Sequence, residues 1–149
     1  MGSKKAVTKN QRIVLNTYTK MMRATNSVTM RMHKHLADHR LTVSQFGVLE
    51  ALYHLGPLCQ RDIGNKILKT SGNITLVIDN LEKRNLVKRE KDKNDRRYMT
   101  VNLTKKGKKL ISKIFPLHAR IAEQVFSSIT TEEMDMLGKI MKVLGKACK

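Results

Sequence analysis

Two different spacings of apolar residues follow each other between residues 71 and 107. The first is the i, i+3, i+4, i+7 spacing of one helix face, and it comprises Ile74, Val77, Ile78 and Leu81. The second alternates apolar with polar residues, as in a half-buried strand: Met99, Thr100, Val101, Asn102 and Leu103. Lysines, arginines and acids lie between them. The pattern predicts a helix followed by a charged hairpin, which is the layout of a winged helix.

Upstream, one long helix is expected from Thr8 to about Asp38. Its apolar residues are spread around the helix: Ile13, Leu15, Tyr18, Met21, Met22, Val28, Met32 and Leu36. Such a spread indicates two buried faces, one against the same chain and one against a second subunit.

Three shorter helices are expected next. Thr42 and Gln45 form a capping box that opens the first of them, and Gly56-Pro57 ends it. Its inward residues are Phe46, Leu49, Leu52 and Tyr53. The next helix runs from about Gln60 to Leu68. After a turn at residues 69–72, Ser71 is the expected N-cap of the last, and Asn85 its left-handed C-cap.

Two further helices follow the hairpin. One is expected from about Lys106 to Ser127, with a bend at Pro116, and the other is opened by a capping box at Thr130 and Glu133. The apolar face of the last helix comprises Met134, Leu137, Ile140, Met141 and Leu144.

The predicted fold is therefore mostly α with a small β-wing. An N-terminal helix (1–40) and C-terminal helices (105–149) form a dimerisation lobe, and residues 41–104 form a winged helix-turn-helix lobe. The long helices at the two ends are expected to interleave with those of a second copy.

The helix at residues 71–83 has a small, polar outward face. It comprises Gly72, Asn73, Leu76, Asn80 and Lys83, with Thr75 at its edge. Asn73, Thr75 and Asn80 carry groups that hydrogen-bond base edges, and Leu76 suits a thymine methyl. Gly72 allows the backbone to approach a phosphate. A plain solvated surface is the alternative, but the adjacent wing favours DNA.

Charge supports the same reading. The chain has 30 Lys and Arg against 12 Asp and Glu, a formal net charge of +18, which favours a polyanionic partner. Nucleic acid comes first and an anionic membrane surface second. Between Glu82 and Lys109, twelve basic residues face four acids, an excess of 12 − 4 = +8.

The wing tip concentrates part of this charge. Arg96 and Arg97 lie at or near it, where a guanidinium can enter a minor groove. Asp95 beside them is an unfavourable contact for phosphate. We therefore expect Asp95 to orient an arginine, and Arg97, two residues along an extended segment, is the expected partner.

Other classes of protein fit less well. The sequence contains no apolar run of the ~20 residues that a spanning helix needs and no signal-peptide core, so a cytoplasmic location is expected. No phosphate-binding glycine loop or nucleophile with a base is present, which argues against an enzyme and a cofactor. His35 and His39 lie one helical turn apart without evident further ligands, so no metal site is predicted. Cys59 and Cys148 are expected to be free thiols, with a redox-sensing Cys59 as the alternative.

These segments resemble the MarR family of transcriptional regulators. Residues 95–107, DRRYMTVNLTKKG, contain the D-x-R, the aliphatic-x-Leu-Thr and the final glycine of the family's wing. Residues 81–89, LEKRNLVKR, match its L-E-K-[KR]-G-L-V-x-R with Asn85 in place of glycine, and residues 41–49 resemble its entry to the DNA-binding lobe.

The resemblance implies a homodimer that binds a pseudo-palindromic operator in double-stranded DNA. Base contacts would fall on Ser71, Asn73, Thr75, Leu76 and Asn80, and a minor-groove contact on Arg97. Many members carry a basic residue where this chain has Leu76, so base preference does not transfer. Members commonly act as repressors released by a small phenolic or lipophilic effector.

Residues that suit an effector cleft are Met21, Met22, His33, Phe46 and Tyr53, with a role in the hydrophobic core as the alternative. Two other functions remain open: an architectural protein that coats nucleic acid without reading sequence, and a repressor that has no ligand. The specificity ratio separates the architectural protein from a regulator, since a regulator prefers its operator by ~10³ or more.

Overall fold

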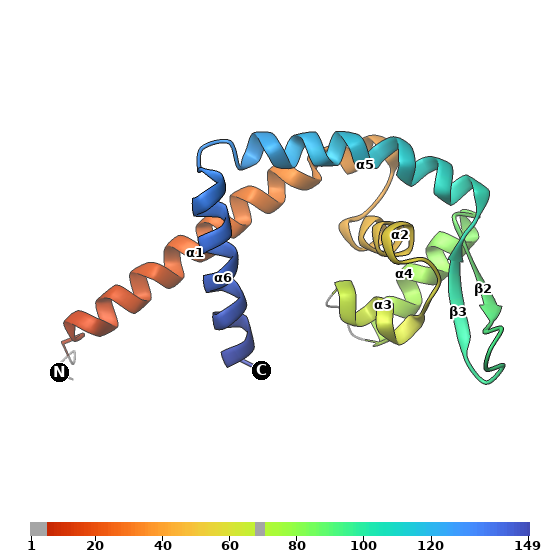
Figure 1. Cartoon of the computed structure of the whole chain (residues 1–149), viewed down its shortest axis with the longest axis horizontal. Helices are drawn as coiled ribbons and strands as arrows, with labels where there is room; N and C mark the ends of the chain where they lie inside the picture. Colours follow the sequence, from red (N-terminus) through yellow and green to blue (C-terminus); the bar gives the residue numbers. More distant parts are fainter. Residues whose placement is uncertain (1–5, 68–70) are drawn as a thin grey trace, which may run out of the picture. The chain divides into compact units, whose positions relative to one another are not determined.

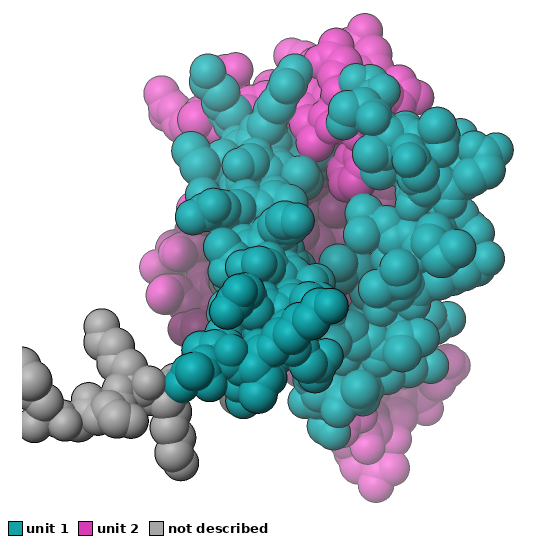
Figure 2. Space-filling view, turned by 90° about the vertical axis from the view of Figure 1, so that its left-hand side faces the viewer, with its two compact units in different colours: residues 1–34, 127–149 teal, residues 35–126 magenta. Residues whose placement is uncertain are grey.

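The computed structural model describes residues 6–67 and 71–149 and divides into two compact units. Unit 1 joins the two ends of the chain, residues up to 34 and residues 127–149, and unit 2 is the continuous segment 35–126 (Figures 1 and 2). The helix that follows the wing belongs to unit 2, whereas the sequence grouped it with the terminal helices.

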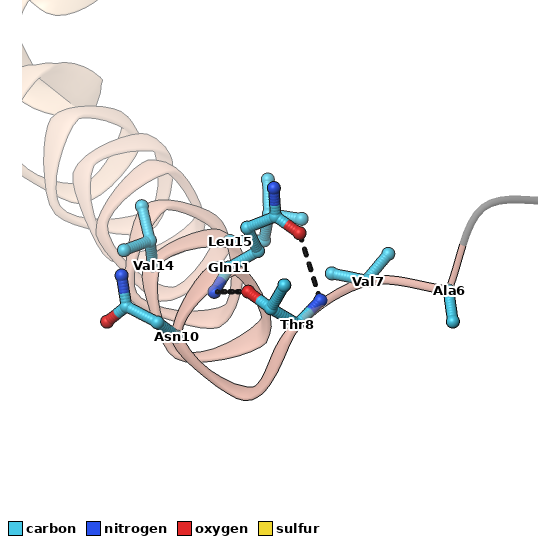
Figure 3. A pocket seen from close by; sticks show the side chains of 7 residues that line it. All are labelled: Ala6, Val7, Thr8, Asn10, Gln11, Val14 and Leu15. Carbon is cyan, nitrogen blue, oxygen red and sulfur yellow. Dashed lines mark hydrogen bonds between the residues drawn. The ribbon is translucent and has the colours of Figure 1, made fainter.

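Unit 1 contains α1 (Lys9–His33) and α6 (Thr131–Ala147). A capping box opens α1: the Thr8 amide donates to Gln11 Oε1 (2.9 Å) and the Gln11 amide donates to Thr8 Oγ1 (3.1 Å; Figure 3). The predicted box at Thr130 and Glu133 opens α6 in the same way, with distances of 2.7 and 3.1 Å. Both helices therefore begin at residues that satisfy their free amides.

Apolar side chains of unit 1 are uncovered. Among the described residues of this unit, neither helix has a buried residue. An open groove of about 610 Å³ is lined by Ile13, Val14, Thr17, Tyr18, Met21, Met141, Leu144, Gly145 and Cys148. Because α1 and α6 expose apolar faces to this extent, the terminal helices have a surface that suits a protein partner.

The first helix is shorter than the sequence predicted. α1 ends at His33, and a 3₁₀ helix, η1 (Lys34–His39), follows in place of further α-helix. Within η1, His35 and Leu36 are buried. A 3₁₀ turn brings residues i and i+3 to the same side, as an α-helix nearly does. Apolar spacing over six residues therefore cannot separate the two.

The core of unit 2 lies among α2 (Val43–Leu55), α3 (Gln60–Ile67), α4 (Ser71–Lys83) and α5 (Lys105–Val125). Its fully buried side chains include Val48, Leu49, Ile63, Ile74, Ile78, Leu81, Val101, Ile111 and Ile114. The predicted capping box of Thr42 and Gln45 opens α2, and Gly56, at φ +78°, ends it. The predicted inward position of Tyr53 was wrong, because its ring lies at the surface beside His54 and Phe115.

A three-stranded antiparallel sheet completes unit 2, in the order β1-β3-β2. The wing is β2 (Val87–Lys91) paired with β3 (Met99–Leu103), from Val87 opposite Leu103 to Lys91 opposite Met99. The third strand, β1 (Leu58–Cys59), pairs with Val101 and Thr100 and was not predicted. Two residues are too few to show a periodicity.

The sequence predicted a cap at each end of α4, and only the C-terminal one is found as predicted. Ser71 is the first residue of the helix itself rather than its N-cap, and the turn residues before it lie outside the described part of the chain. At the other end Asn85 has φ +57°, so the predicted left-handed C-cap is confirmed. The backbone then turns directly into β2.

The start of α5 closes the base of the wing. A Cβ on Gly107 would lie 1.9 Å from the Leu86 carbonyl oxygen, so this close approach of two backbones requires glycine. The Thr104 hydroxyl donates to the Asn85 carbonyl at 2.6 Å and accepts from the Gly107 amide at 3.0 Å. The first of these bonds ties the start of α5 to the residue that caps α4, and the second is the N-cap of α5 itself.

Candidate nucleic-acid interface

The helix α4 has one buried and one open face. Ile74, Ile78 and Leu81 are at most 1% exposed, and Val77 is half-buried, as the spacing predicted. On the other side lie the predicted DNA-facing side chains. Asn73, Thr75, Leu76 and Lys83 are exposed, Asn80 is half-buried, and Ser71 and Gly72 form the first residues of the helix.

Leu76 stands out on this face, since it is 61% exposed on a helix whose other leucine is fully buried. A solvated leucine adds nothing to the packing of unit 2. An apolar group on an otherwise polar, accessible face suits contact with a thymine methyl.

One residue of this surface was missed by sequence reasoning. Gln60, the first residue of α3, donates from Nε2 to Thr75 Oγ1 on α4 at 2.5 Å. The sequence contained no signal for it, because Gln60 and Thr75 are 15 positions apart and meet only where α3 packs against α4.

Hydrogen bonds of Asp92 shape the wing tip. Its Oδ1 accepts from the amides of Asn94 (2.7 Å) and Asp95 (2.9 Å). The Asp92 amide donates to the Tyr98 carbonyl (2.9 Å), and the Tyr98 amide donates to the Asp95 carbonyl (3.0 Å). The loop that carries Arg96 and Arg97 is thus a folded turn rather than a free chain.

Asp95 and Arg97 form the pair that the sequence predicted. Arg97 Nε lies 3.0 Å from Oδ1 and Nη2 lies 2.8 Å from Oδ2, a bidentate ion pair, and the Arg97 amide also donates to Oδ1 at 3.1 Å. The side-chain hydrogen bond from Arg97, followed by the backbone one, lowers the pKa of Asp95 below its usual 3.8. The same contact raises the pKa of Arg97.

The pair leaves much of the guanidinium accessible. The Arg97 side chain is 84% exposed, and its bonds to Asp95 use only the Nε and Nη2 positions. Since a guanidinium has five N–H donors, the donors on Nη1 point to solvent while Asp95 fixes the plane. Arg96 beside it is exposed as well.

Arg89 connects the wing to α4. From β2 its guanidinium reaches Asp79 Oδ1 (2.5 Å) and Glu82 Oε1 (3.1 Å) on α4, and its amide donates to Glu82 Oε2 (3.0 Å). Figure 1 places α4 and β2 side by side. Arg89 counted toward the basic excess in the sequence, but its charge is engaged within the protein.

A second group of basic residues joins the base of the wing to η1. Arg84 donates from Nη1 to the Arg40 carbonyl (2.7 Å) and from Nη2 to the His39 carbonyl (3.2 Å). Lys106 Nζ donates to the Arg84 carbonyl (3.0 Å). Arg84 and Lys106 therefore satisfy carbonyl groups where helices end.

The residues proposed for an effector occupy several places. In unit 1, Met21 lines the apolar groove, Met22 is exposed and His33 lies in the last turn of α1. In unit 2, Phe46 is buried. Tyr53 lies beside Phe115, with ring centroids 6.2 Å apart.

Phe46 belongs to a histidine cluster that sequence reasoning missed. Its ring centroid lies 4.6 Å from that of His118, and His118 Nδ1 lies 3.0 Å from His35 Nε2. These two histidines are 8% and 9% exposed. The sequence paired His35 with His39 and ignored His118, which is 83 residues away.

The described residues contain no group of three or more His, Cys, Asp or Glu that suits a metal ion. Cys59, in β1, and Cys148, after α6, are free thiols. In the same part of the chain, no helix combines the length and apolar character that crossing a membrane requires.

Comparison with known proteins places these features in a family. The sequence profile of the MarR family matches residues 41–99. The HTH-type transcriptional regulator MhqR of Bacillus subtilis (strain 168) is 38% identical over 135 residues, which cover 91% of this chain and 93% of that protein.

Solved structures share the fold. AbsC, a MarR family transcriptional regulator from Streptomyces coelicolor, matches with a TM-score of 0.83 at 21% identity, with 97% of each chain covered. BpsR of Bordetella bronchiseptica, whose DNA binding is regulated by 6-hydroxynicotinic acid, matches with a TM-score of 0.76 at 24% identity, over 85% of this chain and 91% of that one.

Proposed function

The chain belongs to the MarR family of transcriptional regulators, and we propose that it is a homodimeric, sequence-specific repressor that a small effector releases from DNA. The family and the relatives are transcriptional regulators and not enzymes. The observation that carries the proposal is the polar open face of α4 beside a wing tip on which Asp95 fixes Arg97.

In this proposal α4 lies in a major groove, whose width of about 12 Å admits one α-helix. Asn73, Thr75 and Asn80 hydrogen-bond base edges, and Leu76 contacts a thymine methyl. The wing crosses the adjacent backbone so that Arg97 enters the minor groove. The net charge of +18 adds an attraction to phosphate that depends steeply on salt.

We propose that the uncovered apolar faces of α1 and α6 bind a second copy of the chain. Isologous pairing buries the same patch on both copies and presents two α4 helices related by a two-fold axis. Two such helices read half-sites about one helical turn apart, some 34 Å, on a pseudo-palindromic operator.

For the effector we propose a small phenolic or other lipophilic molecule. The support is chemical: rings of Phe46, His35 and His118 cluster in unit 2, and Tyr53 lies beside Phe115 on the same pair of helices, α2 and α5. We place the protein in the cytoplasm, where its DNA would be.

Fluorescence anisotropy at about 150 mM salt tests the proposal, with duplex from upstream of the protein's own gene and a scrambled duplex of equal length. We expect nanomolar, saturable binding to the upstream duplex and a preference of ~10³ or more. Phenolic compounds should then release that probe.

The second candidate is an architectural protein that coats nucleic acid, which the charge of +18 favours. Its signature would be equal affinity for both duplexes, with the same steep salt dependence. Equal affinity for these probes and for every other promoter fragment of the genome would replace the regulator with this candidate.

A further inference from the structure

The contact between Gln60 and Thr75 joins two helices on the open side of unit 2. Gln60 Nε2 donates to Thr75 Oγ1 at 2.5 Å, from the first residue of α3 to the exposed face of α4. Thr75 is one of the residues proposed to face DNA. The side-chain amide of Gln60 is therefore held at the edge of the proposed reading surface.

Stability gives little reason for this contact. Ile63 of α3 and Ile74 and Ile78 of α4 are at most 1% exposed and already hold the two helices in the core. A hydrogen bond between accessible side chains adds little to folding, because water replaces it readily. The position of the Gln60 amide is better explained by the hydrogen-bonding groups that it directs toward solvent.

The donors and the acceptor of the Gln60 amide indicate which base it can bind. A glutamine side chain has two N–H donors and one carbonyl acceptor. When Thr75 takes the N–H that points away from Oε1, the remaining N–H and Oε1 stand side by side along one edge of the amide. That edge complements adenine in the major groove, where N7 accepts and the N6 amino group donates.

We propose that Gln60 is a specificity-determining residue that reads adenine of an A·T pair, with Thr75 orienting its amide. Guanine offers two acceptors, so O6 would oppose Oε1, and cytosine offers only a donor. The inference rests on the proposed function, since it requires α4 to lie in a major groove.

The test is selection from a pool of duplexes of about 30 base pairs with a randomised centre, which is long enough to hold two half-sites one helical turn apart. The full-length wild-type protein should enrich A·T at one position in each half-site. Gln60→Ala should lose that preference by about tenfold or more while the other enriched positions keep theirs. Gln60→Glu should change the preference to C·G, because a carboxylate accepts from the cytosine amino group.

Thr75 gives a second readout. Thr75→Ser keeps the hydroxyl and should keep the A·T preference at the Gln60 position, whereas Thr75→Ala should weaken it. The double variant Gln60→Ala, Thr75→Ala should be no worse than Gln60→Ala alone at that position, because both changes remove the same contact.

Asn65→Ala is the matched control, since Asn65 is an exposed amide on the same helix, α3. It should enrich the same sequences as the wild type. Thermal melting by circular dichroism checks that every variant is folded.

The outcomes distinguish failure of the role of Gln60 from failure of the proposed function. Enrichment by the wild type that Gln60→Ala and Gln60→Glu leave unchanged at every position would overturn the role of Gln60 and keep the regulator. A wild type that enriches nothing would overturn the proposed function and this inference with it.

Discussion

A negative residue at the tip of a DNA-binding wing is explained by its neighbour. Asp95 is bonded to Arg97 through both carboxylate oxygens, so its charge is neutralised before DNA arrives. What remains is an arginine whose plane is fixed and whose outer edge is open, which lowers the entropy lost when it binds.

Replacing Arg97 with Ala should therefore weaken binding to all duplexes, because a phosphate contact carries no base information and a minor-groove contact distinguishes little more than A·T from G·C. The slope of log affinity against log salt should flatten by about one phosphate equivalent. Anisotropy titrations at several salt concentrations measure both. An unchanged slope would remove Arg97 from the interface.

Asp95→Ala should also weaken DNA binding, although the substitution removes a negative charge. Without the carboxylate the guanidinium loses its orientation and the tip loses a hydrogen bond to the Arg97 amide. The measurement is the affinity for the same duplex at matched salt. If the variant binds DNA more tightly, Asp95 acts by repulsion and does not orient Arg97.

The lowered pKa of Asp95 fixes the pH range of this effect. A carboxylate with a depressed pKa contributes above its ordinary value of 3.8 and loses the contribution as pH falls through the lower folded value. The difference in affinity between wild type and Asp95→Ala should therefore stay constant between about pH 5 and 8. A difference that fades within that range would contradict the pairing.

Among the helices and strands, α4 and the wing together form the proposed DNA-binding surface. Arg89 binds Asp79 and Glu82 from β2, while Arg84 and Lys106 fasten the base of the wing to η1 and α5. Contacts within the protein thus set the angle between α4 and the hairpin before DNA binds.

Arg89→Ala should weaken DNA binding roughly tenfold, since it breaks charged hydrogen bonds that orient the wing. The salt slope should stay at the wild-type value, because Arg89 neutralises protein acids and not phosphate. Arg97→Ala serves as the comparison. A slope that falls by one unit would show that Arg89 contacts DNA directly.

The end of α4 gives a prediction about stability. Asn85 has φ +57°, a conformation that costs an ordinary L-residue about 1 kcal/mol. Asn85→Ala should lower the free energy of unfolding by about that amount, and Asn85→Gly should not lower it. Chemical denaturation followed by circular dichroism measures both, and equal losses would contradict the backbone argument.

The sequence predicted these elements where a local signal exists. Capping boxes at Thr42 and Thr130 and the apolar spacing of α4 gave helix starts and buried faces that the structure confirms. It failed where tertiary contacts decide: the 3₁₀ segment after His33, the two-residue strand β1 and the exposed Tyr53.

In the candidate site, too, contacts between residues close in sequence were predictable and contacts set by packing were not. Asp95 and Arg97 are two residues apart, so local geometry predicted their bond. Gln60 and Thr75, like His35 and His118, meet only after the helices pack, and no spacing rule links them. Contacts that depend on packing need the structure.

For the whole molecule, the apolar faces of α1 and α6 are the main feature without a role inside one chain. Ile140 is 54% exposed and Val143 71% exposed on α6, and α1 exposes Ile13 and Leu15 similarly. Burying such side chains is the dominant favourable term in association.

Ile140→Asp should break the proposed dimer, because a carboxylate would be desolvated at the interface. We expect the dimer dissociation constant to rise roughly a hundredfold or more. Sedimentation equilibrium should give twice the 17.1 kDa chain mass for the wild type and the chain mass for the variant. Lys142→Asp, on another side of the helix, is the control and should remain dimeric. A monomeric wild type would contradict the proposal.

Sequence-specific binding by a dimer is tested most directly by selection with the wild-type protein from a fully randomised duplex pool at about 150 mM salt. We expect enrichment of two-fold symmetric sequences with half-sites about one helical turn apart, bound ~10³ or more tighter than the starting pool. Retention of the pool without enrichment of any sequence would contradict it, since the protein would then bind DNA by charge alone.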